Sequence, residues 1–291
     1  MSHKHKSFKL YPGCVKGVFD THAHLYDEML SESPLGGSPE EILGRAASVG
    51  IDSILIPSDS IETSKAAIEY VRKWNGYEGI SLYCSVGVHP HEAKTLDDKA
   101  MDMLEEMLKD RKDNRIAAVG EIGLDYYYDY SPRDVQKDAY IRQMELCHKA
   151  DIPFILHERE ASGDNLIILK EMNEKGLLRD NPGVCHCCSC SLEISRELLK
   201  LGFYLGFDGP ITFKNNVKNS EVLANAPLDR IVIETDSPYL SPEPNRGLIN
   251  EPSNVLYVLE RLAELKGISV DEAAEVTHRN ALNLYEINPG G

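Results

Sequence analysis

Two histidines follow an apolar stretch near the start of the chain, in the segment VFDTHAHLYDE at residues 18–28. If Val18 and Phe19 end a buried strand, His22 and His24 point to the same side, because successive side chains of a strand alternate between its faces. Two imidazoles side by side suit one divalent metal ion. Ordinary polar residues at a strand end give the same short pattern, so both interpretations stay open at this point.

Similar polar residues follow later apolar stretches of the chain. Six of the ten histidines fall at such ends. Glu121 lies between Gly120 and Gly123, which indicates tight packing, and a carboxylate buried there needs a partner. The full set in chain order is His22 and His24, His89 and His91, Glu121 and Asp125, His157 and Arg159, His186, and Glu234 and Asp236.

The elements that must position these residues alternate along the chain. Short apolar runs, nearly continuous as in parallel strands covered on both faces, alternate with amphipathic stretches. We expect strands at 17–22, 52–58, 81–89, 115–123, 153–158, 183–187, 203–207 and 229–235. Eight strand–helix units predict an α/β fold, a single-domain TIM-type (β/α)8 barrel at residues 17–291 after an N-terminal tail at 1–16.

A doubly wound open sheet is the alternative architecture. It usually has a glycine-rich phosphate turn, and no G-x-G-x-x-G follows the first expected strand. In a barrel, active sites lie at the carboxyl ends of the strands, where all these polar residues would meet. Four histidines and two carboxylates on one rim are enough ligands for two metal ions that share a carboxylate.

The bulk composition limits the function classes. The chain has 291 residues, 42% hydrophobic and 27% charged, typical of a folded globular protein. Its net charge of -16 argues against broad binding to duplex DNA, although bound cations still allow chemistry on phosphates. No apolar run reaches the ~18 residues of a membrane span. No apolar h-region follows the basic start, so we expect a cytoplasmic protein. The sequence implies no obligate protein partner.

Several motifs together resemble those of TatD-related deoxyribonucleases, in order and in spacing. They are DTHAHL, GVHPHEA, GEIGLDYY, LHEREA, HCCSCS and ETDSPYLSPEPNRG…NEP, from Phe19 to about Tyr285. The resemblance implies a metal-dependent TIM-barrel hydrolase of the wider amidohydrolase group. It also implies cleavage of phosphodiester bonds, often from the 3′ end of single-stranded DNA, so that single-stranded nucleic acid is the expected substrate.

The resemblance also implies roles for particular residues. His22, His24 and Asp236 would hold one divalent metal ion, Glu121 would bridge, and His157 and His186 would hold the second ion. The ions could be Mg²⁺, Mn²⁺ or Zn²⁺. Many relatives in the wider group bridge their metals with a carbamylated lysine, and Glu121 in its place disfavours amidases and phosphotriesterase-like enzymes.

Catalysis on this hypothesis uses Asp236 and Glu121, with Asp236 as ligand and general base for a water. The candidates for substrate binding are Arg159, His89, Arg246 and Lys214. Tyr126, Tyr127 and Tyr128 could stack on bases, although ordinary loop packing is favoured. The rival function is hydrolysis of amide, ester or lactone bonds in small molecules. A degenerate, non-catalytic barrel is disfavoured because all six ligands are present.

The cysteine-rich tract at 185–190 departs from the resemblance. The family usually shows H-C-F-S-G, whereas here Cys188 replaces the aromatic residue and Cys190 the glycine. The tract has only one C-x-x-C, and a zinc finger needs two ligand pairs. We expect Cys185 and Cys187 to be packing residues of a strand, and Cys188 and Cys190 to be loop thiols. Adventitious binding of soft metals, or oxidation at Cys190, is plausible.

Overall fold

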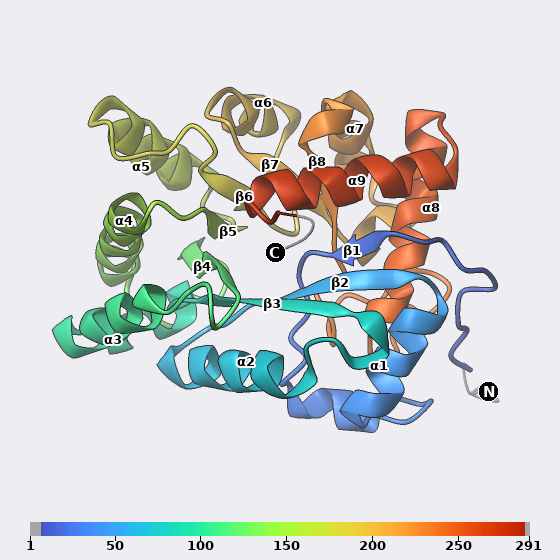
Figure 1. Cartoon of the computed structure of the whole chain (residues 1–291). Helices are drawn as coiled ribbons and strands as arrows, with labels where there is room; N and C mark the ends of the chain where they lie inside the picture. Colours follow the sequence, from blue (N-terminus) through green and yellow to red (C-terminus); the bar gives the residue numbers. More distant parts are fainter. Residues whose placement is uncertain (1–6, 289–291) are drawn as a thin grey trace, which may run out of the picture.

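A computed structural model of the chain describes residues 7–288. One sheet of eight parallel strands runs in the order β1 to β8, each strand pairing with the next, and the helices lie around it (Figure 1). The barrel predicted from the sequence is confirmed. The strands are β1 (Val18–Asp20), β2 (Ile51–Ile56), β3 (Ser81–Val86), β4 (Ile116–Asp125), β5 (Phe154–Arg159), β6 (Gly183–Cys185), β7 (Tyr204–Phe207) and β8 (Ile231–Ile233).

One α-helix follows each strand, and a further helix ends the described chain. The helices are α1 (Pro39–Ser48), α2 (Ile61–Trp74), α3 (Asp98–Lys109), α4 (Arg133–Ala150), α5 (Ser162–Glu174), α6 (Leu192–Lys200), α7 (Val217–Asn225), α8 (Val255–Lys266) and α9 (Val270–Leu284). Local sequence explains their ends: Ser38 and Glu41 form a capping box at α1, and Gly267 ends α8 in the left-handed conformation.

The interior of the barrel is filled by side chains. One buried cluster joins residues from every strand except β3, and the partly buried Tyr83 of β3 packs against it. The only α-helix that contributes to this cluster is α9, as expected of residues in the space that the sheet encloses. Ile155 of β5 and Val184 of β6 belong to it. Because side chains alternate along a strand, His157 and His186 point to this same inner side at the carboxyl rim. The end of α9 adds Leu284 at the other end of the barrel.

Hydrogen bonds at the carboxyl rim close the barrel between β8 and β1. The amide of Thr21 donates to the carbonyl of Ile233 at 3.1 Å, and the amide of Asp236 donates to the carbonyl of His22 at 2.9 Å. The amide of His24 donates to the carbonyl of Ser237 at 2.8 Å. The segments that close the barrel are therefore those that carry His22, His24 and Asp236.

The first strand is shorter than predicted. It ends at Asp20, so His22 and His24 lie beyond it, not inside a strand at 17–22. Parallel bridging of Ala23 to Ser237 keeps this segment extended, which preserves the common direction of the two histidines.

The N-terminal segment packs on the barrel from residue 7 onward; residues 1–6 of the expected tail lie outside the described chain. The amide of Val15 donates to the carbonyl of Val49, and the ring of Tyr11 contacts that of Tyr257. Within residues 7–288, none of the helices has the length and apolar character that crossing a membrane requires.

Candidate metal centre

Four side-chain atoms converge beside the junction of β1 and β8. The Nε2 atoms of His22 and His24 lie 3.3 Å apart, and Glu121 Oε1 lies 3.3 Å from the first and 3.5 Å from the second. Asp236 Oδ1 lies 3.6 and 3.5 Å from the same two nitrogens. Four ligands at the usual zinc distances in a tetrahedron are about 3.3 to 3.6 Å apart, so these atoms already have the spacing of a coordination shell.

A second group uses the other oxygen of Glu121. Glu121 Oε2 lies 2.8 Å from His186 Nε2 and 3.4 Å from His157 Nδ1, and these two nitrogens are 3.2 Å apart. Three ligand atoms leave room for water or substrate at a fourth position. Glu121 thus presents one oxygen to each group, and the structure brings all six predicted ligand side chains together.

The backbone around Glu121 is held by neighbouring strands. The amide of Glu121 donates to the carbonyl of Ser58 at 2.7 Å, while the hydroxyls of Ser58 and Ser85 donate to the carbonyl of Gly120. A Cβ at Gly120 would lie 2.7 Å from Cβ of Ile155, so only glycine allows β4 to approach β5 this closely. This confirms the tight packing expected from Gly120.

Hydrogen-bond partners orient two of the histidines. Tyr26 Oη lies 3.2 Å from His24 Nδ1, which leaves Nε2 of that ring for the centre. Asp125 Oδ2 lies 3.3 Å from His157 Nε2, which leaves Nδ1 of that ring to face the centre. A partner on the far ring nitrogen is the usual arrangement for metal-binding histidines, because it fixes the tautomer and the ring orientation.

Burial and mutual charge shift the pKa values of these groups. Burial lowers the pKa of His22 to about 4. Burial opposes the charge on His186, but the neighbouring Glu121 carboxylate outweighs it and raises the pKa of His186 to about 10. Burial would raise the pKa of Glu121, yet the charges of His186 and His22 hold it well below its usual value. The carboxylates of the cluster thus require positive charge next to them.

The donor set fits divalent metal ions. Imidazole nitrogens and carboxylate oxygens are the ligands that Zn²⁺ and similar ions use. Within residues 7–288, no lysine or arginine forms an ion pair with Glu121 or Asp236. Asp59 lies next to the cluster. Burial raises the pKa of Asp59 to about 6, the charges of Glu121 and Asp236 act in the same direction, and the charge on His24 opposes them. A cation is the partner that this concentration of acceptor atoms needs.

The predicted substrate-binding residues lie at different distances from the cluster. His89 is buried, and its ring centroid is 4.2 Å from that of His157. Arg159 is exposed at the end of β5, with its guanidinium 4.2 Å from the centroid of the Tyr127 ring. Arg246 stacks on Phe213. Lys214 lines a different cavity between α7 and α8, next to Val217 and Tyr257, and the structure does not bring it to the cluster.

Sequence reasoning missed several residues that organise the rim. Asp125 was noted only as a rim carboxylate, yet it contacts both His157 and His91. Asp59 follows β2 as Asp236 follows β8, and this position after an apolar run was a signal that could have found it. Gln143 of α4 exchanges hydrogen bonds with the backbone of Val88, which precedes His89.

The cysteine tract differs from expectation in two respects. Cys187 lies after the end of β6 with a φ of 43°, so it is not a strand residue. Cys188 and Cys190 are in the loop as expected, but they are 1% and 2% exposed. Their burial shields these thiols from bulk solvent and from oxidants.

The chain is similar to a known family and to several known proteins. A family model described as "TatD related DNase" matches residues 19–286. The "uncharacterized metal-dependent hydrolase YabD" of Bacillus subtilis (strain 168) is 38% identical over 271 residues, which cover 93% of this chain and 100% of that protein. "Uncharacterized metal-dependent hydrolase YcfH" of Escherichia coli (strain K12) is 35% identical, covering 93% and 96%. The crystal structure of YjjV, a TatD homolog from Escherichia coli K12, matches with a TM-score of 0.82 and 29% identity, covering 93% and 98%.

Proposed function

Because this chain belongs to the TatD-related DNase family, we propose that it is a metal-dependent hydrolase that cleaves phosphodiester bonds of single-stranded DNA, removing nucleotides from the 3′ end. On this proposal His22, His24 and Asp236 hold one divalent ion, and His157 and His186 hold a second. The relatives named above are described as metal-dependent hydrolases, which supports the metal-dependent part of the proposal.

The observation that carries the proposal is the position of Glu121. Its two oxygens face two separate groups of nitrogen and oxygen atoms. A carboxylate in this position can bridge two ions, and paired ions suit in-line displacement at phosphorus, because they neutralise charge on both the attacking and the leaving oxygen.

The residues of the chain supply position and proton transfer. Bound divalent ions would supply a water of lowered pKa and positive charge for the phosphate oxygens. Asp236 stands at the rim, 14% exposed through its side chain, where its carboxylate can accept a proton from water that reaches the cluster. Asp125 and Tyr26 hold the rings of His157 and His24 in place. Glu121 keeps the two halves at a fixed separation.

The surroundings of the cluster support a nucleic acid strand as substrate. The guanidinium of Arg159 lies over the rings of Tyr127 and Tyr128, at 4.2 and 4.8 Å from their centroids. These tyrosines and Tyr130 are exposed. Aromatic faces stack on unpaired bases, and a guanidinium matches phosphate oxygens. Such a small basic and aromatic rim on an acidic protein favours binding of a few nucleotides of a single strand.

A time course on a 5′-labelled single-stranded DNA oligomer tests the proposal. The protein is stripped of metal and then given Mg²⁺, Mn²⁺ or Zn²⁺. We expect a ladder that shortens from the 3′ end, absent with Asp236→Asn and unchanged with Asp113→Asn, an exposed residue before β4 at the opposite end of the barrel. An intact oligomer under every metal, with metal binding demonstrated, would refute the nuclease proposal. Hydrolysis of amide, ester or lactone substrates instead would establish the rival activity.

A further inference from the structure

A second cluster of metal-ligating side chains lies outside the histidine centre. The sulfur atoms of Cys185, Cys188 and Cys190 all lie within 4.8 Å of one another. The three residues are 1–2% exposed and form no disulfide. Three thiols in one buried place, with the spacing C-x-x-C-x-C, have no role in the hydrolytic chemistry proposed above.

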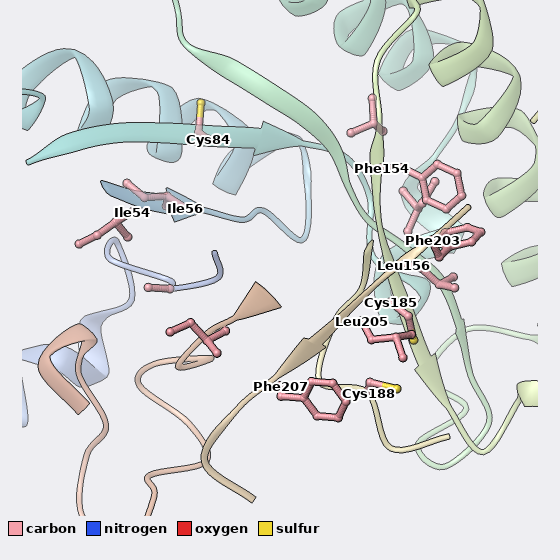
Figure 2. Packing of buried hydrophobic residues seen from close by; sticks show 14 of the residues in the cluster. Ile54, Ile56, Cys84, Phe154, Leu156, Cys185, Cys188, Phe203, Leu205 and Phe207 are labelled. Atoms are coloured by element: carbon pink, nitrogen blue, oxygen red, sulfur yellow. The ribbon is translucent and has the colours of Figure 1, made fainter. Parts of the chain in front are cut away.

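This cluster lies on the outer side of the sheet, behind the histidines. Cys185 ends β6 and pairs with Leu156 of β5 and Leu205 of β7. It alternates with Val184 and His186, which point into the barrel, so its side chain faces the helix layer. Figure 2 shows Cys185 and Cys188 among Leu156, Leu205 and Phe207, with which they form one packed cluster.

A carboxylate completes the cluster. Glu158 of β5 stands between His157 and Arg159 in sequence, so it points outward where His157 points inward. Its Oε2 atom lies 3.1 Å from Sγ of Cys190. The site therefore offers three sulfur atoms and one oxygen atom. Glu158 is next to His157 in the sequence, and the three cysteines belong to the segment that carries His186.

We propose that Cys185, Cys188 and Cys190 bind one soft divalent cation of the Zn²⁺ type, with Glu158 as the fourth ligand. Tetrahedral zinc has Zn–S distances of ~2.3 Å, which places its sulfur ligands about 3.8 Å apart, inside the spread found here. Binding replaces the thiol protons, which pass to solvent, and no atom is oxidised or reduced. The N-terminus of α6, capped by Ser191 directly after Cys190, adds favourable partial positive charge beside the thiolates.

The proposed cysteine site would be structural, whereas the histidine centre would be catalytic. A tetrahedron filled by protein ligands has no position for water or substrate, as in structural zinc sites. It would tie the ends of β5 and β6 to the loop before α6. These are the strand ends that carry His157 and His186, so the ion would act as a positioning element for the second half of the centre.

Cadmium titration tests the proposal directly. Cd²⁺ bound by thiolates gives an ultraviolet sulfur-to-metal charge-transfer band, which nitrogen and oxygen ligands of the histidine centre do not produce. In metal-stripped protein kept reduced, we expect this band to level off at the intensity of one thiolate-bound Cd²⁺ per chain, whatever further Cd²⁺ the histidine centre takes up. The endpoint should disappear with Cys188→Ser. It should persist with Cys187→Ser, in the same tract but outside the cluster, and with Cys147→Ser, another buried cysteine.

Other results would overturn the inference. No band in the reduced wild-type protein, or a band unchanged by Cys188→Ser, would exclude thiolate coordination at this cluster. If Cys188→Ser does not fold, X-ray absorption of the zinc-loaded wild-type protein decides the question. Sulfur neighbours at ~2.3 Å from zinc support the site, and a spectrum with nitrogen and oxygen neighbours alone contradicts it. Neither readout depends on nuclease activity, so this inference can fail while the proposed function stands.

Discussion

At the scale of single residues, Glu121 holds the two halves of the centre together. It is almost fully buried, and its two oxygens face ring nitrogens from three different strand ends. A buried carboxylate among imidazoles depends on positive charge, whether from protons or from metal ions. Removing its charge without changing its shape therefore separates its electrostatic role from its packing.

For Glu121→Gln we expect the folded structure to persist while metal binding weakens at both positions. The amide keeps the volume but replaces one oxygen by a nitrogen that cannot act as a ligand. The loss should exceed the roughly 10–100-fold seen when an outer partner of a ligand is removed. Calorimetric titration of stripped protein with Mn²⁺ measures it, and circular dichroism checks the fold. Two unchanged binding steps would show that Glu121 bridges nothing.

Asp125 acts one step further from the centre. Asp125→Asn weakens the contact that orients His157, whose Nε2 lies 3.3 Å from Asp125 Oδ2. We expect metal affinity or activity to fall by about 10–100-fold, with a normal fold. Asp129→Asn, in an exposed pair with Arg133 next to α4, serves as the control and should behave like the wild type. Equal metal affinity in the two variants would contradict an orienting role.

The sequence was informative about the residues of the centre and less so about their supports. His22, His24, Glu121, His157, His186 and Asp236 could be found because each follows an apolar run, and strand ends meet in a barrel. The roles of Asp125 and Tyr26 could not, because they depend on which ring nitrogen each contacts. Lys214 shows the converse limit, because a cation that follows β7 in sequence lines a separate cavity between α7 and α8.

At the scale of elements, the contact between β1 and β8 closes the barrel. Eight strand–helix units were recognisable because each depends on local patterns of apolar residues. The contact between β1 and β8 could not be recognised in the sequence, because it joins residues that lie far apart along the chain. Asp20 links the two: its Oδ1 accepts from the amide of Thr235 at 2.9 Å, and its Oδ2 from the hydroxyl of Thr235 at 2.7 Å.

Asp20→Ala should destabilise the barrel through this junction. The change leaves the buried amide of Thr235 without its acceptor, at about 1–3 kcal/mol for an unsatisfied group. It also removes one acceptor of the Thr235 hydroxyl, which keeps Ser237 Oγ at 3.0 Å. Asp20→Asn retains an acceptor oxygen and should lose less. Urea unfolding monitored by circular dichroism gives the free energies of unfolding. If alanine and asparagine cost the same, these hydrogen bonds contribute nothing measurable to closure.

At the scale of the whole molecule, metal binding and folding are linked. The proposed ligands lie in β4 and β5 or directly after β1, β6 and β8, and they gather only in the folded barrel. An ion that binds the folded chain alone stabilises it by mass action. The net charge of the chain is -16, so bound cations also reduce the repulsion among its acidic groups.

Removing metal should therefore lower the stability of the whole barrel. With free metal at one hundred times its dissociation constant, each occupied site adds about 2.7 kcal/mol to the free energy of unfolding. We expect urea unfolding of stripped protein to shift to higher urea when Mn²⁺ is restored, and the shift to shrink in His22→Ala. A midpoint that ignores added Mn²⁺ in the wild type would show that no ion binds the native chain in preference to the unfolded one.

The hydrogen bonds that join β8 to the segment after β1 also bear on the order of synthesis. During synthesis His22 and His24 emerge from the ribosome long before Asp236, which follows them much later in the sequence. Until β8 emerges, the first two histidines have neither their carboxylate partner nor the neighbouring strand that holds them extended. A nascent or truncated polypeptide that stops before Asp236 therefore lacks a complete ligand set, and on the proposed function it cannot cut DNA.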